Sequence, residues 1–151
     1  MTKNYRHTQH AGLGWWFSIA VLVALALAVE AWFNGAVLML VVAVLIAVVV
    51  GPVFVVFSRL TVEVDDDALR VFFGWGWPRK SLPLDEVATV RTVRNYWWYG
   101  FGIWWIPRGT VWTVWSLDAV EIVLSSGRVF RIGTDEPQAL LAAFESRVMT
   151  P

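Results

Sequence analysis

Two long apolar runs dominate the N-terminal third of the chain. They cover residues 13–33 and 36–57, only Asn34-Gly35 separates them, and Glu30 is the single charged residue between positions 11 and 57. As helices that rise about 1.5 Å per residue, both runs are long enough to cross a hydrocarbon core roughly 30 Å thick. Asn and Gly suit a tight reversal because both tolerate positive φ. The pattern predicts a transmembrane helical hairpin over residues 11–57.

Two other interpretations of the apolar runs are open. A pair of core helices in a soluble protein would need more covering surface than the rest of the chain offers. A signal peptide would explain Lys3 and Arg6 before the first run, and Ala26-Leu27-Ala28 resembles a cleavage site. The second spanning run follows almost at once, which favours the hairpin.

The cations beside the hairpin lie at its two open ends. Lys3 and Arg6 precede it, Arg59 follows it, and the Asn34-Gly35 tip has no Lys or Arg. The positive-inside rule then predicts a multi-pass protein of the cell (inner) membrane with both termini in the cytoplasm. Residues 1–10 are polar and are expected to be a cytoplasmic tail that is disordered or lies along the membrane surface.

After residue 57 the hydrophobic period changes to two, which is typical of half-buried strands. Apolar and polar side chains alternate over residues 60–64 and 69–73, with Asp65-Asp66-Asp67 as the turn between them. Further strand-like stretches are residues 79–82, 87–94, 111–115, 117–124 and 128–132. An amphipathic helix is expected over about residues 135–148. The fold class is therefore an α+β membrane protein, in which residues 58–151 form one closed or nearly closed β-barrel of about seven strands with a C-terminal capping helix.

Composition narrows the function classes. The chain is 58% hydrophobic with a mean hydropathy of +0.59, which fits a membrane protein. Its 12 basic and 12 acidic residues balance, so there is no basic excess for nucleic acid, and the absence of Cys removes disulfides and thiolate sites. Both His residues lie in the first ten positions, and no nucleophile, metal or phosphate-loop motif is present. We therefore expect no enzyme and no cofactor.

Two sets of residues are candidates for binding. Residues 96–106 are dense in aromatic side chains, and such residues are enriched at protein interfaces and at lipid headgroups. The candidate interface or lipid-contact residues are Trp75, Trp77, Trp97, Trp98, Tyr99, Phe101, Trp104 and Trp105. The candidate anion or headgroup contacts are Arg79, Lys80, Arg91, Arg94 and Arg108, which could equally be ordinary solvated residues.

The chain also resembles a known family. Residues 82–87 (LPLDEV), 97–103 (WWYGFGI), 117–122 (LDAVEI) and 130–135 (FRIGTD) are similar to segments of actinobacterial membrane proteins that have a bacterial pleckstrin-homology-like domain. The resemblance implies two orthogonal antiparallel sheets closed by a C-terminal helix, behind a two-helix membrane anchor. It implies no catalytic residue. The acidic turn at Asp65-Asp66-Asp67 should repel the phosphoinositides that basic residues bind at this turn in eukaryotic pleckstrin-homology domains.

Three functional hypotheses follow. The first is a membrane-anchored, non-catalytic interaction or scaffold module at the cytoplasmic face, which contacts another membrane protein or a second copy of itself. The second is a module whose aromatic loops contact membrane lipid without a protein partner. The third is a membrane enzyme or a transporter accessory subunit.

Overall fold

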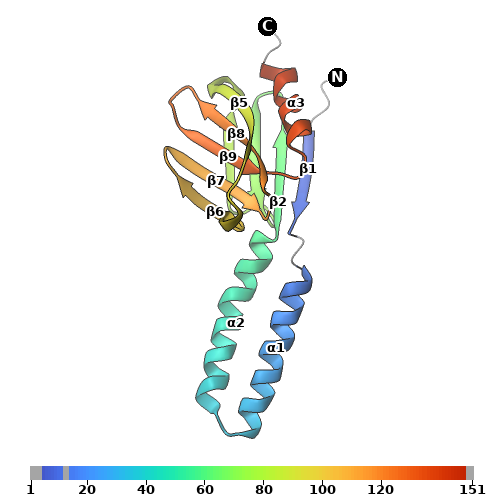
Figure 1. The fold of residues 1–151 in the computed structure, drawn as a ribbon, viewed down its shortest axis with the longest axis vertical. Coiled ribbons are helices and arrows are strands. Elements are labelled where there is room, and N and C mark those ends of the chain that lie inside the picture. Colours follow the sequence, from blue (N-terminus) through green and yellow to red (C-terminus); the bar gives the residue numbers. More distant parts are fainter. Residues whose placement is uncertain (1–4, 12–13, 149–151) are drawn as a thin grey trace. The chain divides into compact units, whose positions relative to one another are not determined.

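The structure is a computed structural model that describes residues 5–11 and 14–148. The chain divides into two compact units, one of Met1–Ala11 with Phe57–Pro151 and the other of Gly12–Val56. The second unit contains helix α1 (Gly14–Phe33) and helix α2 (Val37–Phe57) up to its last residue, joined by a turn at Asn34-Gly35 (Figure 1). Gly35 has a φ of 66°, as the expected reversal requires.

Within the described part of the chain, α2 is the one helix whose length and apolar composition are sufficient to cross a membrane. It has 21 residues, continues through Pro52, and has no buried residue. Helix α1 has 20 residues, and its described apolar part is Val21–Phe33. The two helices therefore match the two predicted apolar runs in position.

The first sheet has four antiparallel strands in the order β1-β2-β3-β4. They are β1 (Tyr5–His10), β2 (Arg59–Val64), β3 (Ala68–Phe73) and β4 (Arg79–Pro83). The expectation that residues 1–10 form a disordered tail is wrong for residues 5–10, which form the edge strand β1 (Figure 1). Its sequence has no apolar alternation, because in this strand the buried side chain is Gln9, which donates a 2.9 Å hydrogen bond to the carbonyl of Val114.

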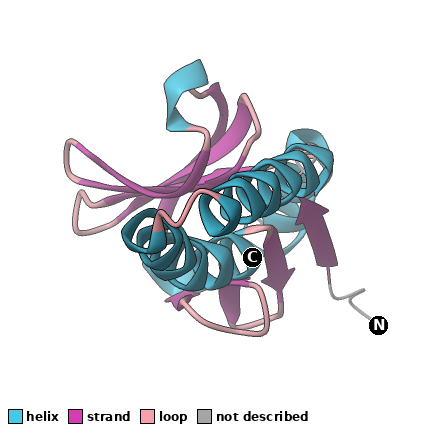
Figure 2. Cartoon of the chain, turned by 90° about the horizontal axis from the view of Figure 1, so that it is seen from below, coloured by secondary structure: helices cyan, strands magenta, loops and turns pink. Residues whose placement is uncertain are grey.

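The second sheet has five strands in the order β5-β8-β9-β7-β6. They are β5 (Val87–Arg94), β6 (Phe101–Ile106), β7 (Gly109–Val114), β8 (Asp118–Leu124) and β9 (Val129–Gly133). Strands β7 and β9 pair in parallel, whereas the other pairs are antiparallel. The described chain therefore has nine strands, and the α+β class is confirmed. The strands lie in two separate sheets that do not close on each other (Figure 2), so the expected closed or nearly closed barrel of about seven antiparallel strands is not confirmed.

The hydrophobic core of the first unit lies between the two sheets. Phe73 of β3 stacks on Trp112 of β7 with ring centroids 5.3 Å apart, and Trp112 meets the edge of Phe130 at 5.7 Å. Helix α3 (Pro137–Val148) buries Leu140 and Phe144 and contacts β5 and β8. The predicted C-terminal helix is confirmed, with a start two residues later than expected.

The chain leaves and re-enters the sheet unit at neighbouring positions. His10 of β1 is paired with Arg59 of β2, and the next residue, Ala11, donates a 2.8 Å backbone hydrogen bond to Ser58. The helical unit is thus an insertion at the end of a β1–β2 ladder. Both ends of this insertion start from one place on the sheet.

Candidate functional site

Five aromatic residues form a continuous set of ring contacts after strand β5. Tyr96 stacks on Trp98 with centroids 4.4 Å apart and planes 6° apart, and Trp98 also contacts Trp97 at 5.9 Å and Tyr99 at 6.3 Å. Tyr99 in turn lies 6.0 Å from Trp104 of β6. We call Tyr96, Trp97, Trp98, Tyr99 and Trp104 the aromatic cluster. Three of its members form the short 3₁₀ helix η2 (Trp97–Tyr99).

The aromatic cluster is exposed although its rings hold one another. Trp97 is 77% exposed, and Tyr96, Trp98 and Trp104 are also exposed. Ring pairs of this kind restrict the rotamers of each member. A partner that binds this surface therefore immobilises few additional side chains, and the entropy cost of binding is small. The cluster is therefore a preformed apolar surface that the described residues leave uncovered.

The backbone on both sides of η2 is tied to the turn after β7. The buried Asn95 donates from its backbone to the carbonyl of Leu117 at 2.6 Å, and Trp115 donates to the carbonyl of Gly100 at 2.7 Å. Gly100 has a φ of 48°, and a Cβ there would lie 2.9 Å from the Trp115 ring. A residue with a side chain would be strained at this φ and would clash with the Trp115 ring. Gly100 therefore permits the close approach that holds the aromatic cluster in place.

The other predicted aromatic residues lie apart from this set of ring contacts. Trp75 and Trp77 are exposed on the β3–β4 loop. Trp105 of β6 is 85% exposed and lines a cavity with Lys80. Phe101 begins β6, and its side chain lies outside the described part of the structure. Sequence reasoning omitted Tyr96 from the candidates, although its position next to Trp97 and Trp98 was a usable signal.

An ion-pair group centred on the buried Glu121 lies in the same sheet as Trp104 of the aromatic cluster. Register places Trp104, Val111, Arg131, Glu121 and Arg91 in one row across the five strands. The Glu121 side chain is 5% exposed and accepts hydrogen bonds from Arg91 Nε at 2.8 Å and from Arg131 Nε at 3.2 Å. Burial by itself raises the pKa of Glu121, but the hydrogen bonds and charges of Arg131 and Arg91 outweigh it and lower that pKa below its ordinary value.

The five predicted anion contacts do not form one site. Lys80 and Arg108 share a cavity, whereas Arg79 lines a neighbouring cavity that also includes Lys80. Arg91 is paired with Glu121, and Arg94 ends β5 opposite Asp118. The sequence did not reveal this separation, because strand register decides which cations face each other.

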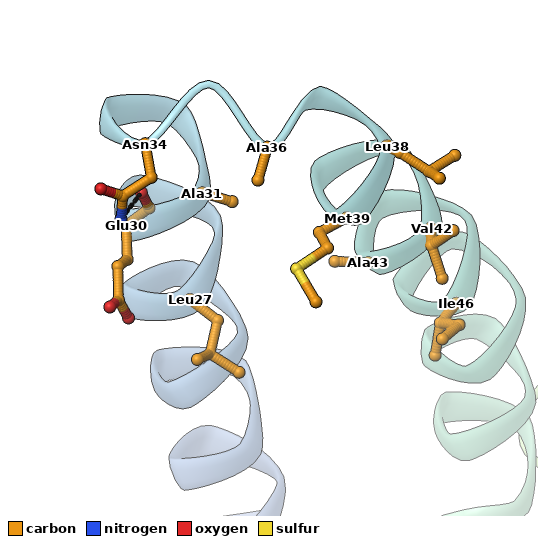
Figure 3. A pocket seen from close by; sticks show the side chains of 10 residues that line it. All are labelled: Leu27, Glu30, Ala31, Asn34, Ala36, Leu38, Met39, Val42, Ala43 and Ile46. Carbon is orange, nitrogen blue, oxygen red and sulfur yellow. Dashed lines mark hydrogen bonds between the residues drawn. The ribbon is translucent and has the colours of Figure 1, made fainter.

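A cavity of about 640 Å³ lies between α1 and α2 near their connecting turn. Figure 3 shows Leu27 and Met39 directed into the gap between the helices, while the carboxylate of Glu30 points away from α2. The Asn34 side chain donates a 3.0 Å hydrogen bond to the backbone carbonyl of Glu30. Glu30 is the only titratable residue among those that line the cavity, so the described helices place no second group beside it for proton transfer.

Among the described residues, no group of three or more His, Cys, Asp or Glu side chains could hold a metal ion. No protein-family profile, curated protein or solved structure matches this chain.

Proposed function

We propose that this protein is a membrane-anchored, non-catalytic interaction module, in which a pleckstrin-homology-like domain presents the aromatic cluster to a protein partner at the cytoplasmic face. The observation that carries this proposal is the connected ring set of Tyr96, Trp97, Trp98, Tyr99 and Trp104, in which every ring except the half-buried Tyr99 is exposed. Tyr and Trp are enriched among the residues that dominate binding energy at protein interfaces.

The helical unit supports the membrane anchor. A core helix of a soluble protein is mostly buried, whereas α2 has no buried residue. Ala11 and Ser58, at the two ends of the insertion, are joined by a 2.8 Å hydrogen bond, so both ends lie on the same side of any bilayer. An even number of crossings fits this geometry, and a membrane-spanning α2 would then favour a spanning α1 as well. The flanking Arg6 and Arg59 favour the cytoplasm for these two ends.

The membrane also favours a protein partner of modest affinity. Two molecules anchored in one membrane meet at a raised effective concentration, so a small contact surface is sufficient. A partner that covers Trp97 and Trp98 would bury the 77% and 53% of their surfaces that remain exposed in the free protein. The partner class is therefore another membrane protein or a second copy of this chain.

Lipid contact is the second candidate function. Trp75 and Trp77 are exposed on one short loop and belong to no contact in the aromatic cluster. Indole rings are favoured at the headgroup level of bilayers. These two residues would rest on lipid while the aromatic cluster contacts protein.

A photocrosslinking experiment tests the proposed partner class. The photoreactive residue p-benzoylphenylalanine replaces Trp97 in one variant and Ser126, exposed on the β8–β9 turn, in the matched control. We expect irradiation of intact cells to give protein adducts at position 97 and few at position 126. Adducts with lipid alone at position 97, or equal protein adducts at both positions, would contradict a specific protein contact.

A further inference from the structure

Three cations from three separate segments converge on one cavity of about 290 Å³. Lys80 comes from β4, Arg108 from the β6–β7 turn, and Arg128 from the β8–β9 turn. No Asp or Glu lines this cavity. Among the described residues, none of the three cations forms an ion pair with a carboxylate. The cavity therefore concentrates positive charge that the described protein does not neutralise.

Lys80 is directed toward the space between the sheets. Its partner in the β3–β4 register is Val71, which is fully buried in the core. The Lys80 ammonium lies 4.4 Å from the centroid of the Phe130 ring. Loss of hydration, followed by the charge of Arg128, lowers the pKa of Lys80. An aromatic ring stabilises a cation less than a carboxylate does. The positive charge of Lys80 is therefore largely unbalanced and would attract an anion bound beside it.

The backbone holds Arg108 beside the start of β9. Arg108 has a φ of 68°, a conformation that is unfavourable for a residue with a side chain and that Gly usually supplies. Its carbonyl accepts a 2.9 Å hydrogen bond from Val129, the residue after Arg128. At Gly109 a Cβ would lie 1.6 Å from the Val129 carbonyl oxygen, so only Gly allows β7 to approach β9 this closely. The two arginines are therefore fixed on neighbouring turns.

A polar atom without a partner and an aromatic wall complete the cavity. The Thr110 hydroxyl oxygen is buried and has no hydrogen-bond partner within the described structure, although Thr110 lines the cavity. A buried hydroxyl without a partner is unfavourable, and a bound anion would accept its hydrogen bond. Trp105 lines the same cavity and is largely exposed. The cavity thus offers charge, one hydroxyl donor and an apolar surface together.

We propose that this cavity binds a phosphate-bearing anion with an apolar or aromatic substituent. Lys80, Arg108 and Arg128 pair with the phosphate oxygens, the Thr110 hydroxyl donates a hydrogen bond, and Trp105 contacts the substituent. Its volume is at the small end of ligand sites, which fits a headgroup or a small phosphate ester. The site is separate from the aromatic cluster and does not involve the acidic turn at Asp65-Asp66-Asp67.

Calorimetric titration of the full-length protein in neutral detergent tests this site with two probes. Inorganic pyrophosphate represents soluble phosphates, and dihexanoyl phosphatidylglycerol represents lipid headgroups, with dihexanoyl phosphatidylcholine as the zwitterionic control. We expect saturable binding of at least one anionic probe and a weaker affinity at high salt. Binding of pyrophosphate alone would identify a soluble ligand, and binding of phosphatidylglycerol alone would identify a lipid. Wild-type protein that binds neither anion, or that binds phosphatidylcholine equally, would overturn the proposal.

Three variants locate the binding. Lys80→Met, which keeps the length of the side chain, should weaken binding about tenfold or more because it removes a charge-assisted contact. Arg79→Gln is the matched control, since Arg79 is adjacent in β4 and does not line this cavity. Thr110→Val should weaken binding without lowering resistance to urea, because the hydroxyl has no partner in the described protein. An equal loss of affinity in Arg79→Gln and Lys80→Met, or unchanged affinity in Lys80→Met and Thr110→Val, would contradict this site.

Discussion

Replacement of residues 12–57 by Asn-Gly is expected to release the sheet domain from the membrane as a folded, water-soluble protein. The hydrogen bond from Ala11 to Ser58 is the geometry that closes a two-residue β-hairpin. Asn-Gly is the preferred sequence for such a turn, because both of its residues adopt positive φ. The β1–β2 ladder from His10–Arg59 to Tyr5–Val64 would then be closed by a tight turn in place of the two helices.

Fractionation and near-ultraviolet circular dichroism measure this result. We expect the shortened protein in the soluble fraction without detergent and the full-length protein in the membrane fraction. The shortened protein loses the Phe57 ring, whose centroid lies 4.8 Å from that of Phe73, so a small decrease in stability is expected. A shortened protein that aggregates or has no near-ultraviolet signal would show that the helical unit is needed for the sheet domain to fold.

Glu121→Gln is expected to destabilise the sheet domain by about 2–3 kcal/mol at neutral pH, because it leaves Arg131 and Arg91 without their carboxylate. An amide accepts through its oxygen alone, and its NH₂ group faces arginine donors. Arg131 is largely buried, whereas Arg91 is exposed and regains water, which keeps the effect below that of a fully buried pair. Urea denaturation in mild detergent, followed by tryptophan fluorescence, measures the change.

The effect of Glu121→Gln should depend on pH in one direction. The pKa of Glu121 is lower in the folded protein than its ordinary value of 4.5, so the carboxylate stabilises the fold above that value. This contribution is lost as pH falls through the lowered pKa, and the variant and the wild type should converge in acid. Glu63→Gln is the matched control, since Glu63 pairs with the exposed Arg6 at 3.2 Å and should change stability by less than about 1 kcal/mol. Equal effects of the two substitutions would contradict a special role for the buried group.

The periodic parts of the chain could be predicted from the sequence. The two apolar runs match α1 and α2, the alternation around the acidic turn matches β2 and β3, and the amphipathic stretch matches α3. Strands β1 and β6 were missed for opposite reasons. β1 shows no apolar alternation because its buried side chain is the polar Gln9, and β6 is so rich in aromatic residues that no alternation of apolar and polar residues remains.

The sequence indicated which kinds of residue form the candidate sites better than it indicated which of these residues lie together in the fold. The aromatic density at residues 96–106 indicated the aromatic cluster, because neighbours in sequence supply most of its ring contacts. The cationic cavity depends on pairings between distant segments, which the sequence alone does not reveal. Arg128 was overlooked for this reason, and Arg91 was assigned to an anion site although β5–β8 register pairs it with Glu121.

In the proposed topology, α1 and α2 cross the membrane twice and their connecting turn lies on the opposite side of the membrane from both chain termini. The chain has no Cys, so single-cysteine variants can be labelled without background. Asn34→Cys places a thiol in the connecting turn, and Ser126→Cys places one on the exposed β8–β9 turn. In cells with a permeable outer envelope and an intact inner membrane, a membrane-impermeant maleimide should label position 34, and position 126 should react only after the membrane is opened. Labelling of position 126 in unopened cells, or of position 34 only after lysis, would contradict the proposed topology.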